Sequence, residues 1–401
     1  MSDQLDLFED MGGQGWIDRR SYAELAEAFC TSTPYRLSPL NKRNWGGSLH
    51  SLCSYQGKLK PSIAHVLVAW FTQPGDTVYD PMSGVGTIPL EARRQGRIAL
   101  GNDLSPLAYA VTSAKIEPID REKLGDERAK FARAIAADAR LDDLTAEVDV
   151  DWGLNRPLVE YFHSETLREV LLARRYLLSE DAADTAECNL IRSSVMHVLH
   201  GNRPYALSRR SHPVTPFAPT GAFEYRSLLD RLDRRLGGVV PELLQLRDSS
   251  PDGHATLGDF RRAQSGQIDS VITSPPFSKS LRFWSSNWMR LWFSGWDPDD
   301  FKVQPERYLE TEQKISYEPY GEFARQLAPS MKAGSRLILH LGETSSERMS
   351  DEISPLLAPY FDVRYIGRED VGDTESHGLT DKGATVAHWY LFAERSTTAI
   401  H

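Results

Sequence analysis

Hydrophobic and polar positions follow two different periods along the first part of the chain. Between residues 61 and 115, short apolar runs that suit buried strands are interleaved with runs that repeat every three to four positions, as helices do. These runs predict strands at residues 76–80 and 97–103 and helices at residues 63–71, 87–96 and from Ser105 onward. Because strands and helices alternate along the chain, we expect an α/β fold with a parallel, doubly wound sheet.

The middle of the chain follows the helical period alone. Four segments repeat apolar positions in this way, at residues 122–140, 164–180, 186–201 and 225–246. The α/β pattern then returns, with strands predicted at residues 266–274, 335–342, 361–369 and 384–393. The last two are separated by polar chain, and we expect them to pair as an antiparallel hairpin.

These patterns divide the chain into three parts. Residues 1–45 are expected to be irregular. Residues 46–118 and 251–401 are expected to form one sheet domain, mostly parallel with an antiparallel hairpin at its C-terminal end. Residues 119–250 are expected to form a helical insertion in that domain.

Composition indicates the environment of the protein. The 401 residues are 40% hydrophobic and 25% charged, which is typical of a globular protein long enough for one large domain or two. No apolar run approaches the roughly 18–20 residues of a membrane span, and the acidic N-terminus lacks the basic and apolar parts of a secretion signal. The three cysteines are widely spaced, which favours a reducing compartment and no zinc site. We therefore expect a cytoplasmic protein with no membrane partner and no metal.

Charge limits how the protein could contact nucleic acid. The formal net charge of −10 argues against nucleic-acid binding over the whole protein surface. A local basic stretch at residues 202–213 holds Arg203, Arg209 and Arg210 and no acidic residue. On its own, such a stretch is more readily explained as a solvated loop.

A glycine-containing turn follows the first predicted strand. The strand ends at Asp80, and Ser83, Gly84 and Gly86 lead into the next helix. Glycines there let the backbone approach a ligand closely, and the start of the helix offers unpaired N–H groups. Because Gly-Lys-Ser/Thr and a third glycine are both missing, phosphate-binding loops fit poorly. An acid at the strand end would repel a pyrophosphate but could receive an ammonium group, which points to S-adenosylmethionine.

Two further acids stand where neighbouring strands are expected to end. Asp103 closes the second predicted strand, where an acid is spaced to accept hydrogen bonds from ribose hydroxyls. Asp259, with Phe260 beside it, precedes the strand at 266–274, and the two could bind and cover an adenine ring. Each acid alone is as well explained as a helix N-cap. Together they lie in the order that adjacent strand ends of one sheet require.

A second motif, Thr-Ser-Pro-Pro-Phe, stands at residues 273–277. With "YQGKLKPSIAHVLVAWFTQPGDTVYDPMSGVGTIPLEA" at residues 55–92, it resembles the DNA amino-methyltransferases that modify cytosine N4 or adenine N6. In that family the cofactor motif is Asp-Pro-Phe-x-Gly-x-Gly-Thr, and the catalytic motif is Asp, Asn or Ser followed by Pro-Pro and an aromatic residue. Ser274, with Thr273 before it, is most similar to the cytosine-N4 group.

The resemblance implies a Rossmann-like methyltransferase fold and a set of site residues. Those implied to bind S-adenosylmethionine are Lys60, Pro61, Asp80, Pro81, Met82, Ser83, Gly84, Gly86, Thr87, Asp103, Leu104, Asp259 and Phe260. Met82 replaces the aromatic residue usual in the family. By similarity, the Ser274 side chain and the Pro275 carbonyl accept hydrogen bonds from the target amine, and Pro275 and Pro276 hold that carbonyl rigidly. Phe277 would stack on the base, at about 1–3 kcal/mol by analogy with other base–aromatic stacks.

The resemblance also implies a nucleic-acid partner. We expect duplex DNA, with the target cytosine flipped out of the helix at a cost of a few kcal/mol. The helical insertion is the expected recognition element. The basic residues expected to contact DNA are Arg203, Arg209, Arg210, Lys279 and Arg282. A restriction endonuclease that acts separately is a further candidate partner.

Several alternatives stay open. The same machinery could methylate adenine N6 in DNA, and RNA amino-methyltransferases use related motifs, although no RNA-binding module is recognisable. A cofactor-binding subunit without catalysis is a third alternative, against which the intact glycine turn and Ser274-Pro275-Pro276-Phe277 argue. For the Pro-Pro motif alone, the alternative is a rigid surface turn. The four tryptophans in residues 284–296 are more typical of a core or a lid than of a base-stacking surface.

Overall fold

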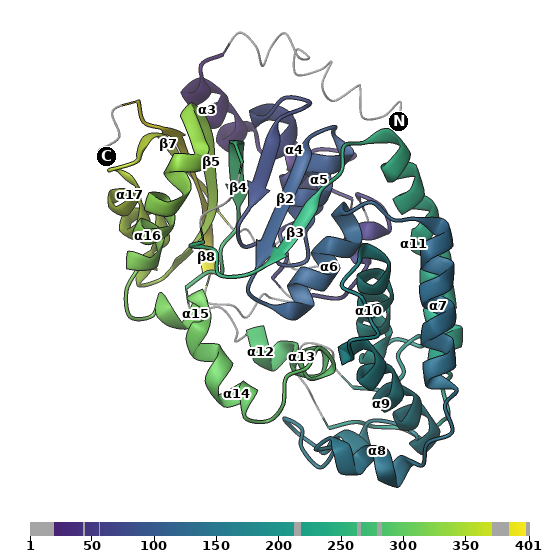
Figure 1. The fold of residues 1–401 in the computed structure, drawn as a ribbon. Coiled ribbons are helices and arrows are strands. Elements are labelled where there is room, and N and C mark those ends of the chain that lie inside the picture. The colour runs from purple at the N-terminus through teal and green to yellow at the C-terminus, as the bar shows by residue number, and fades with distance from the viewer. Residues whose placement is uncertain are drawn as a thin grey trace.

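The structure is a computed structural model that describes residues 20–42, 45–55, 57–211, 218–262, 266–278, 283–370 and 385–397. One eight-stranded sheet has the order β3-β2-β1-β4-β5-β8-β7, and β6 pairs with β5 outside this path (Figure 1). The strands are β1 (Thr77–Asp80), β2 (Ile98–Asp103), β3 (His254–Leu257), β4 (Ile268–Thr273), β5 (Met331–Thr344), β6 (Glu347–Arg348), β7 (Phe361–Asp370) and β8 (Thr385–Arg395).

The sheet is parallel over most of its width and antiparallel at one end. β1 runs parallel to β2 and β4, and the pairs β2–β3 and β4–β5 are parallel too. β8 runs antiparallel to both of its neighbours, β5 and β7. The mostly parallel sheet and the pairing of the last two strands are therefore confirmed. β3 was not predicted, because four residues are too few to show a period and it becomes a strand by lying along β2.

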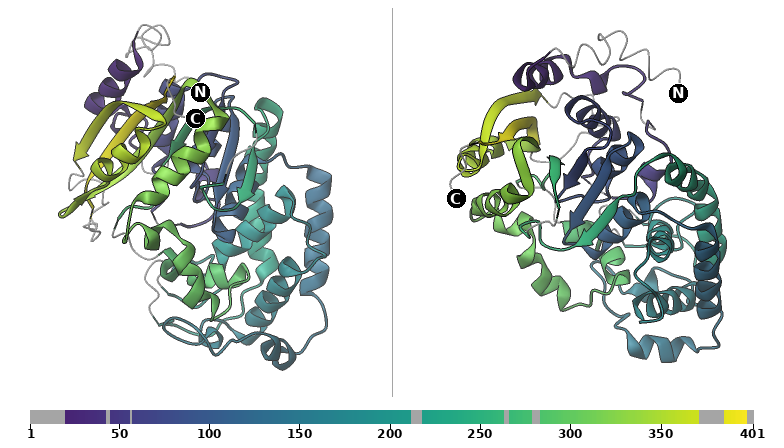
Figure 2. Two further views of the ribbon diagram at one scale, coloured as in Figure 1. Left: turned by 60° about the vertical axis from the view of Figure 1, so that its left-hand side comes forward. Right: turned by 45° about the horizontal axis from the view of Figure 1, so that its top comes forward.

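Helices cover both faces of this sheet (Figure 2). The helices are α3 (Tyr22–Ser32), α4 (Pro61–Phe71), α5 (Thr87–Arg94), α6 (Pro106–Ile116), α7 (Arg121–Ile135), α8 (Leu141–Glu147), α9 (Ser164–Leu178), α10 (Ala186–Leu199), α11 (Leu228–Ser249), α12 (Phe283–Ser286), α13 (Trp288–Phe293), α14 (Asp300–Val303), α15 (Leu309–Glu312), α16 (Glu318–Leu327) and α17 (Met349–Leu357). Successive strand residues serve opposite faces: Val78 belongs to the core under α3 and α4, whereas Tyr79 belongs to the core under α16 and α17. No helix in the described ranges is both long and apolar enough to cross a bilayer.

The N-terminal segment contains a helix that the hydrophobic pattern did not reveal. α3 begins after Ser21, whose side chain forms a capping box with Glu24. Its residue Phe29 is fully buried, and the ring packs edge-on against Tyr390 of β8, with ring centroids 5.1 Å apart. The prediction that residues 1–45 are irregular is therefore wrong for α3. The apolar face of α3 is short, and the strands that bury it come from the far end of the chain.

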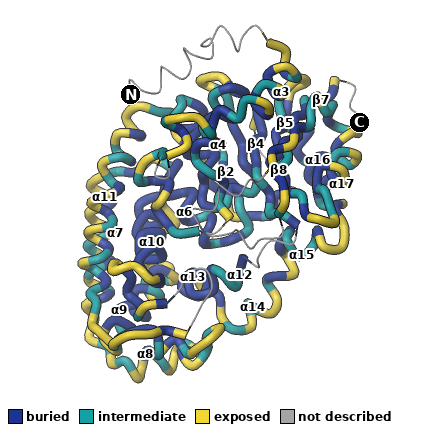
Figure 3. Tube along the Cα trace, turned by 180° about the vertical axis from the view of Figure 1, so that it is seen from behind, coloured by how far each residue is buried: buried dark blue, intermediate teal, exposed yellow. Residues whose placement is uncertain are grey.

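The predicted helical insertion packs directly on the sheet domain. α10 lies along α6 and also contacts α7 and α11, and it is almost entirely buried (Figure 3). One hydrophobic core joins Val85, from the glycine turn, to Phe131 of α7 and to Trp288 and Trp292 of α13. Because these two tryptophans are each only 1% exposed, they belong to the core, as expected. Where one domain ends and the next begins stays a prediction, since the two share this core.

Candidate active site

The turn between β1 and α5 is tightly packed against α6. Gly84 and Gly86 have φ angles of +52° and +67°, in the left-handed region that favours glycine. A Cβ on Gly86 would lie 2.9 Å from the Thr112 hydroxyl oxygen and 3.1 Å from the Thr112 Cα. The Ser83 N–H donates to the Asn102 carbonyl of β2 at 2.9 Å. The backbone of this turn is therefore held close to the end of β2 and to α6.

Asp103 joins the end of β2 to the glycine turn. Its carboxylate accepts hydrogen bonds from the backbone N–H of Gly84 at 2.8 Å and of Ser105 at 2.9 Å. Burial raises the pKa of Asp103 to about 6, although these hydrogen bonds oppose the shift. A carboxylate fixed in this way can present its remaining lone pairs to hydroxyl groups of a ligand.

Asp80 connects the glycine turn to the Pro-Pro motif. Its side chain is 2% exposed, and Oδ1 accepts hydrogen bonds from the Thr273 hydroxyl at 2.6 Å and from the Met82 N–H at 3.2 Å. Burial raises the pKa of Asp80 to about 7 despite these bonds. Because Thr273 is the last residue of β4, directly before Ser274, the structure brings the two sequence motifs together at one edge of the sheet.

Side chains from β5 and from the turn after α15 form hydrogen bonds with the Pro-Pro motif. The Ser274 hydroxyl lies 3.0 Å from Nδ1 of His340, which is on β5 and 4% exposed. The Pro276 carbonyl accepts a hydrogen bond from the Gln313 side chain at 2.9 Å. Phe277 packs over Gly342, where a Cβ would lie 2.7 Å from the Phe277 ring.

His340 is a site residue that the sequence analysis missed. Burial, and then the neighbouring His388, lower the pKa of His340 well below its usual value, so the imidazole is neutral. Its Nε2 has no hydrogen-bond partner among the described residues. A neutral imidazole that carries its proton on Nε2 accepts the Ser274 hydroxyl hydrogen at Nδ1. In "SRLILHLG" the histidine reads as one polar residue in a buried strand, and no local signal relates it to Ser274.

An acidic residue and two tyrosines near Asp103 were also missed. Ring atoms of Tyr55 lie 3.6–3.7 Å from where a Cβ on Gly84 would stand. Burial, and then the charge of Asp103, raise the pKa of Glu310 to about 8. The same two causes raise the pKa of Tyr308. Tyr308 and Glu310 therefore lie close enough to Asp103 to respond to its charge, and no local pattern in the sequence relates them to it.

The other residues implied to bind the cofactor either contact other side chains or lie in the turns and helix starts beside the site. Asp259 forms a two-point ion pair with Arg261, and Phe260 packs in the core against Phe323, with centroids 5.6 Å apart. Lys60 and Pro61 begin α4, and their cofactor contacts stay a prediction. The remaining implied residues, Pro81, Met82, Ser83, Thr87 and Leu104, lie in the turns after β1 and β2 or at the start of α5.

Three of the basic residues expected to contact nucleic acid lie in the described part of the loop that follows α10. The guanidinium of Arg209 donates to the carbonyls of Gly221 and Glu160 and lies over the Phe223 ring, 4.0 Å from its centroid. Arg203 and Arg210 are exposed. Lys279 and Arg282 lie outside the described residues, and all five contacts stay predictions.

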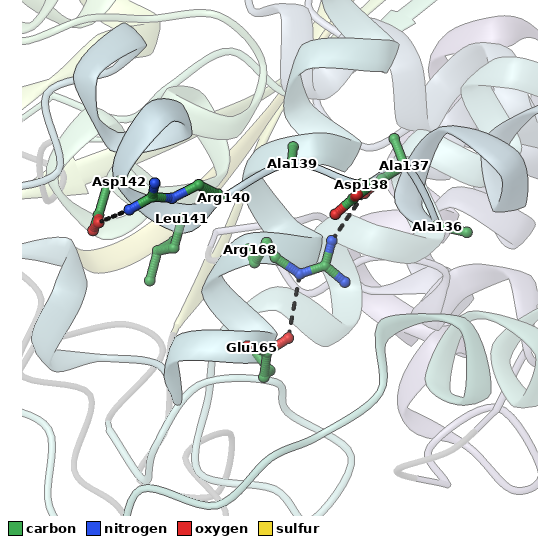
Figure 4. A pocket seen from close by; sticks show the side chains of 9 residues that line it. All are labelled: Ala136, Ala137, Asp138, Ala139, Arg140, Leu141, Asp142, Glu165 and Arg168. Carbon is green, nitrogen blue, oxygen red and sulfur yellow. Dashed lines mark hydrogen bonds and ion pairs between the residues drawn. The ribbon is translucent and has the colours of Figure 1, made fainter.

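A pocket in the helical insertion is separate from the site. It lies between the turn from α7 to α8 and the start of α9 (Figure 4). Arg168 crosses it and donates to Glu165 at 3.2 Å and to the Ala137 carbonyl at 3.1 Å. None of the predicted site residues lines this pocket.

The part of the chain that contains the glycine turn matches a known protein family. A family model described as UPF0020, RMKL-like, methyltransferase domain matches residues 51–139. No curated protein shows significant similarity to the chain.

Three solved structures show what the chain is similar to at low identity. TrmN from Thermus thermophilus has 13% identity and a TM-score of 0.29 over 85% of this chain and 50% of that chain, so this chain spans half the length of TrmN. An rRNA methylase from Streptococcus thermophilus has 9% identity and a TM-score of 0.30, covering 84% of this chain and 98% of that chain. The rRNA methyltransferase aviRa from Streptomyces viridochromogenes has 12% identity and a TM-score of 0.35, covering 90% and 96%.

The family match and the site geometry agree on the coarse chemistry. Residues 51–139 include Tyr55, the glycine turn and Asp103, which together form a cradle at the end of β1 and β2. The close approach of Gly86 to Thr112 and the two buried carboxylates suit a ligand with an ammonium group and ribose hydroxyls. This part of the chain is therefore a methyltransferase domain, and its methyl donor is S-adenosylmethionine.

Proposed function

We propose that the protein methylates an exocyclic amine of a base in nucleic acid. The observation that carries this proposal is the 2.6 Å hydrogen bond from Thr273 to Asp80. This bond links the end of β4, which precedes Ser274-Pro275-Pro276-Phe277, to the end of β1, which precedes the glycine turn. A methyl donor held at the turn and an amine held at the Pro-Pro motif would then meet at one edge of the sheet.

The cofactor would be held by charge and by backbone fit. S-adenosylmethionine supplies an electrophilic methyl group when it is bound. Asp80 uses Oδ1 for its two hydrogen bonds, which leaves Oδ2 for the ammonium group of the cofactor. Asp103 would accept hydrogen bonds from the ribose hydroxyls, and Gly84 and Gly86 would let the backbone approach.

The target amine would be oriented by two acceptors. Because Ser274 can donate its hydrogen to His340, its oxygen lone pairs remain free to accept an N–H from the amine. By the resemblance, the Pro275 carbonyl would be the second acceptor, and the next carbonyl, of Pro276, is held by Gln313. Two accepted N–H bonds aim the nitrogen lone pair toward the methyl group. His340 acts through Ser274 and is a positioning residue.

We propose RNA with an unpaired target base as the first substrate to test. An unpaired base needs no extrusion from a duplex, so it demands fewer phosphate contacts from a protein with a net charge of −10. The segment that leads into α14 is acidic as well, with Asp297 and Asp299 exposed. Cytosine N4 in duplex DNA is the second candidate, favoured by serine rather than aspartate or asparagine at position 274.

Nucleoside mass spectrometry tests this proposal directly. The purified chain is incubated with labelled S-adenosylmethionine and unmodified RNA or DNA, each is digested, and the labelled nucleoside is identified. We expect label on an amino nitrogen, in RNA for the first candidate and on deoxycytidine N4 for the second. Label on carbon or on a ring nitrogen, or full activity in a Ser274→Ala variant, would refute the proposed chemistry.

A further inference from the structure

Four basic side chains from separate segments gather behind the glycine turn. We refer to Lys58, Lys115, Arg235 and Arg290 as the basic cluster. They come from the loop before α4, from α6, from α11 and from α13. None of them forms an ion pair with a carboxylate in the part of the chain that the structure describes. Each donates instead to neutral acceptors.

Neutral oxygens hold the cluster in place. The Lys115 ammonium donates to the carbonyl of Val85, inside the glycine turn. Lys58 donates to the His50 carbonyl at 2.7 Å, and Arg235 donates to the carbonyl of the next residue, Ser51. In the same way, Arg290 donates to the Met196 carbonyl of α10 at 3.1 Å and to the Asn287 side chain. A carbonyl orients a cation but does not neutralise it.

Two members of the cluster are buried, the other two are half-buried, and some nitrogen atoms are left without a partner among the described residues. Lys115 is 0% and Arg290 is 3% exposed. Nη2 of Arg290, Nε of Arg235 and Nδ1 of the adjacent His197 are shielded from solvent and have no partner among the described residues. Burying an unpaired cation or an unsatisfied N–H is unfavourable, so the arrangement is incomplete as it stands.

Cys53 lies near the cluster, shortly after the two residues whose carbonyls accept from Lys58 and Arg235. Burial raises the pKa of its thiol, and the charges of Arg290, Arg235, Lys115 and Lys58 oppose that shift. Lys115 is pushed well below its usual pKa by burial and then by the charge of Lys58.

Glu91 and Glu242, two acids of neighbouring segments, are engaged with other partners. Glu91 binds His50 at 2.7 Å, His65 at 2.8 Å and Arg94 at 3.0 Å. Glu242 binds Arg94 and accepts from the Ser48 hydroxyl at 2.6 Å. Neither carboxylate is left to neutralise the basic cluster.

We infer that the basic cluster binds a backbone phosphate of the nucleic acid whose base enters the site. An anion would neutralise the buried charges and satisfy the unused N–H groups, and the arginine forks match phosphate oxygens. Arg235 and Arg290 belong to α11 and α13 rather than to the strand ends and the glycine turn. Lys115 connects the cluster to the glycine turn through Val85, so the phosphate would sit near the target nucleotide. The phosphate's identity rests on the proposed function, whereas anion binding does not.

Binding measurements on three variants test the inference without relying on methyl transfer. Arg235→Gln and Lys58→Gln each remove one positive charge from the cluster. Arg234→Gln is the matched control, because Arg234 is the exposed neighbour on α11. Fluorescence anisotropy with labelled RNA and duplex DNA is recorded across a salt series, and calorimetry measures S-adenosylmethionine affinity without nucleic acid. Melting temperatures establish that each variant is folded, and Lys58→Gln carries the test if Arg235→Gln unfolds.

The outcomes separate the possible anions. We expect each cluster variant to bind the substrate polymer about tenfold more weakly and with a salt slope smaller by about 1, while cofactor affinity is unchanged and Arg234→Gln behaves like the wild type. Weaker cofactor binding with unchanged nucleic-acid binding would assign the cluster to the cofactor carboxylate and overturn the inference. Unchanged affinity for both would show a structural role only. Failure of the wild type to bind either polymer would refute the phosphate, whereas tight binding without transfer would refute only the proposed function.

Discussion

Replacing His340 by phenylalanine tests how the Pro-Pro motif orients the target amine. His340→Phe keeps a ring between Phe277 and Tyr390, whose centroids lie 5.2 and 4.9 Å from the imidazole, but removes the acceptor 3.0 Å from the Ser274 hydroxyl. Ser274 then loses the partner that directs its lone pairs toward the amine. A hydrogen bond between neutral groups contributes about 0.5–1.5 kcal/mol, so kcat should fall by about 2- to 12-fold.

Stability and affinity should respond differently from the rate. The variant removes a buried Nε2 that has no partner among the described residues, so the melting temperature should stay equal or rise. Among the described residues, no hydrogen bond or ring contact joins His340 to the glycine turn, so the KM for S-adenosylmethionine should not change. A steady-state methyl-transfer assay and a thermal melt measure these quantities.

A double variant decides whether His340 acts through Ser274. In Ser274→Ala/His340→Phe the loss should equal that of Ser274→Ala alone, since the hydrogen bond is already absent. Tyr390→Phe is the matched control: it alters the neighbouring side chain, whose hydroxyl contacts Glu369, and should leave kcat unchanged. This account of His340 would be refuted if the kcat loss of the double variant equalled the product of the two single losses. A raised KM for the cofactor in His340→Phe would refute it as well.

Three further predictions concern the turn and its neighbours. Because the folded-state pKa of Asp80 is raised to about 7, its contribution to stability is present at low pH and is lost as pH rises toward 7. The cofactor-free wild type should therefore lose up to about 1.4 kcal/mol per pH unit relative to Asp80→Asn between pH 4.5 and 7, as measured by denaturant unfolding, and a flat difference would contradict the buried, protonated carboxyl. Gly86→Ala should destabilise the protein by about 1–3 kcal/mol and weaken cofactor binding, because φ is +67° and the new Cβ meets Thr112 at 2.9 Å; an unchanged melting temperature would contradict this. Gly342→Ala should displace Phe277, whose ring lies 2.7 Å from the new Cβ, and should therefore lower kcat. Cofactor affinity, measured by calorimetry, should not change, and a parallel loss of affinity and kcat would contradict this prediction.

Local patterns in the sequence were enough to predict the frame of the sheet and part of the site. A strand period, a helix period and a turn that needs glycine each depend on residues close together in the chain. For this reason β1, the turn through Gly84 and Gly86, β2 and β4 were predicted in the right order. Parallel strands bring their carboxyl ends to one edge, so Asp80 and Asp103 could be placed at neighbouring strand ends, as the parallel pairing of β1 and β2 confirms. The hydrogen bond that brings Ser274 beside Asp80 was seen only in the structure.

Contacts between distant segments could not be read from the chain. His340 faces Ser274 because β5 happens to lie beside β4, and Glu310 approaches Asp103 only because α15 folds over the sheet edge. α3 is a helix held by strands from the other end of the chain, and β3 exists by pairing with β2. The basic cluster combines four segments in which each cation looks like an ordinary surface residue. Side-chain pairing of this kind depends on which faces are buried together, and burial is a property of the packed chain rather than of any local stretch.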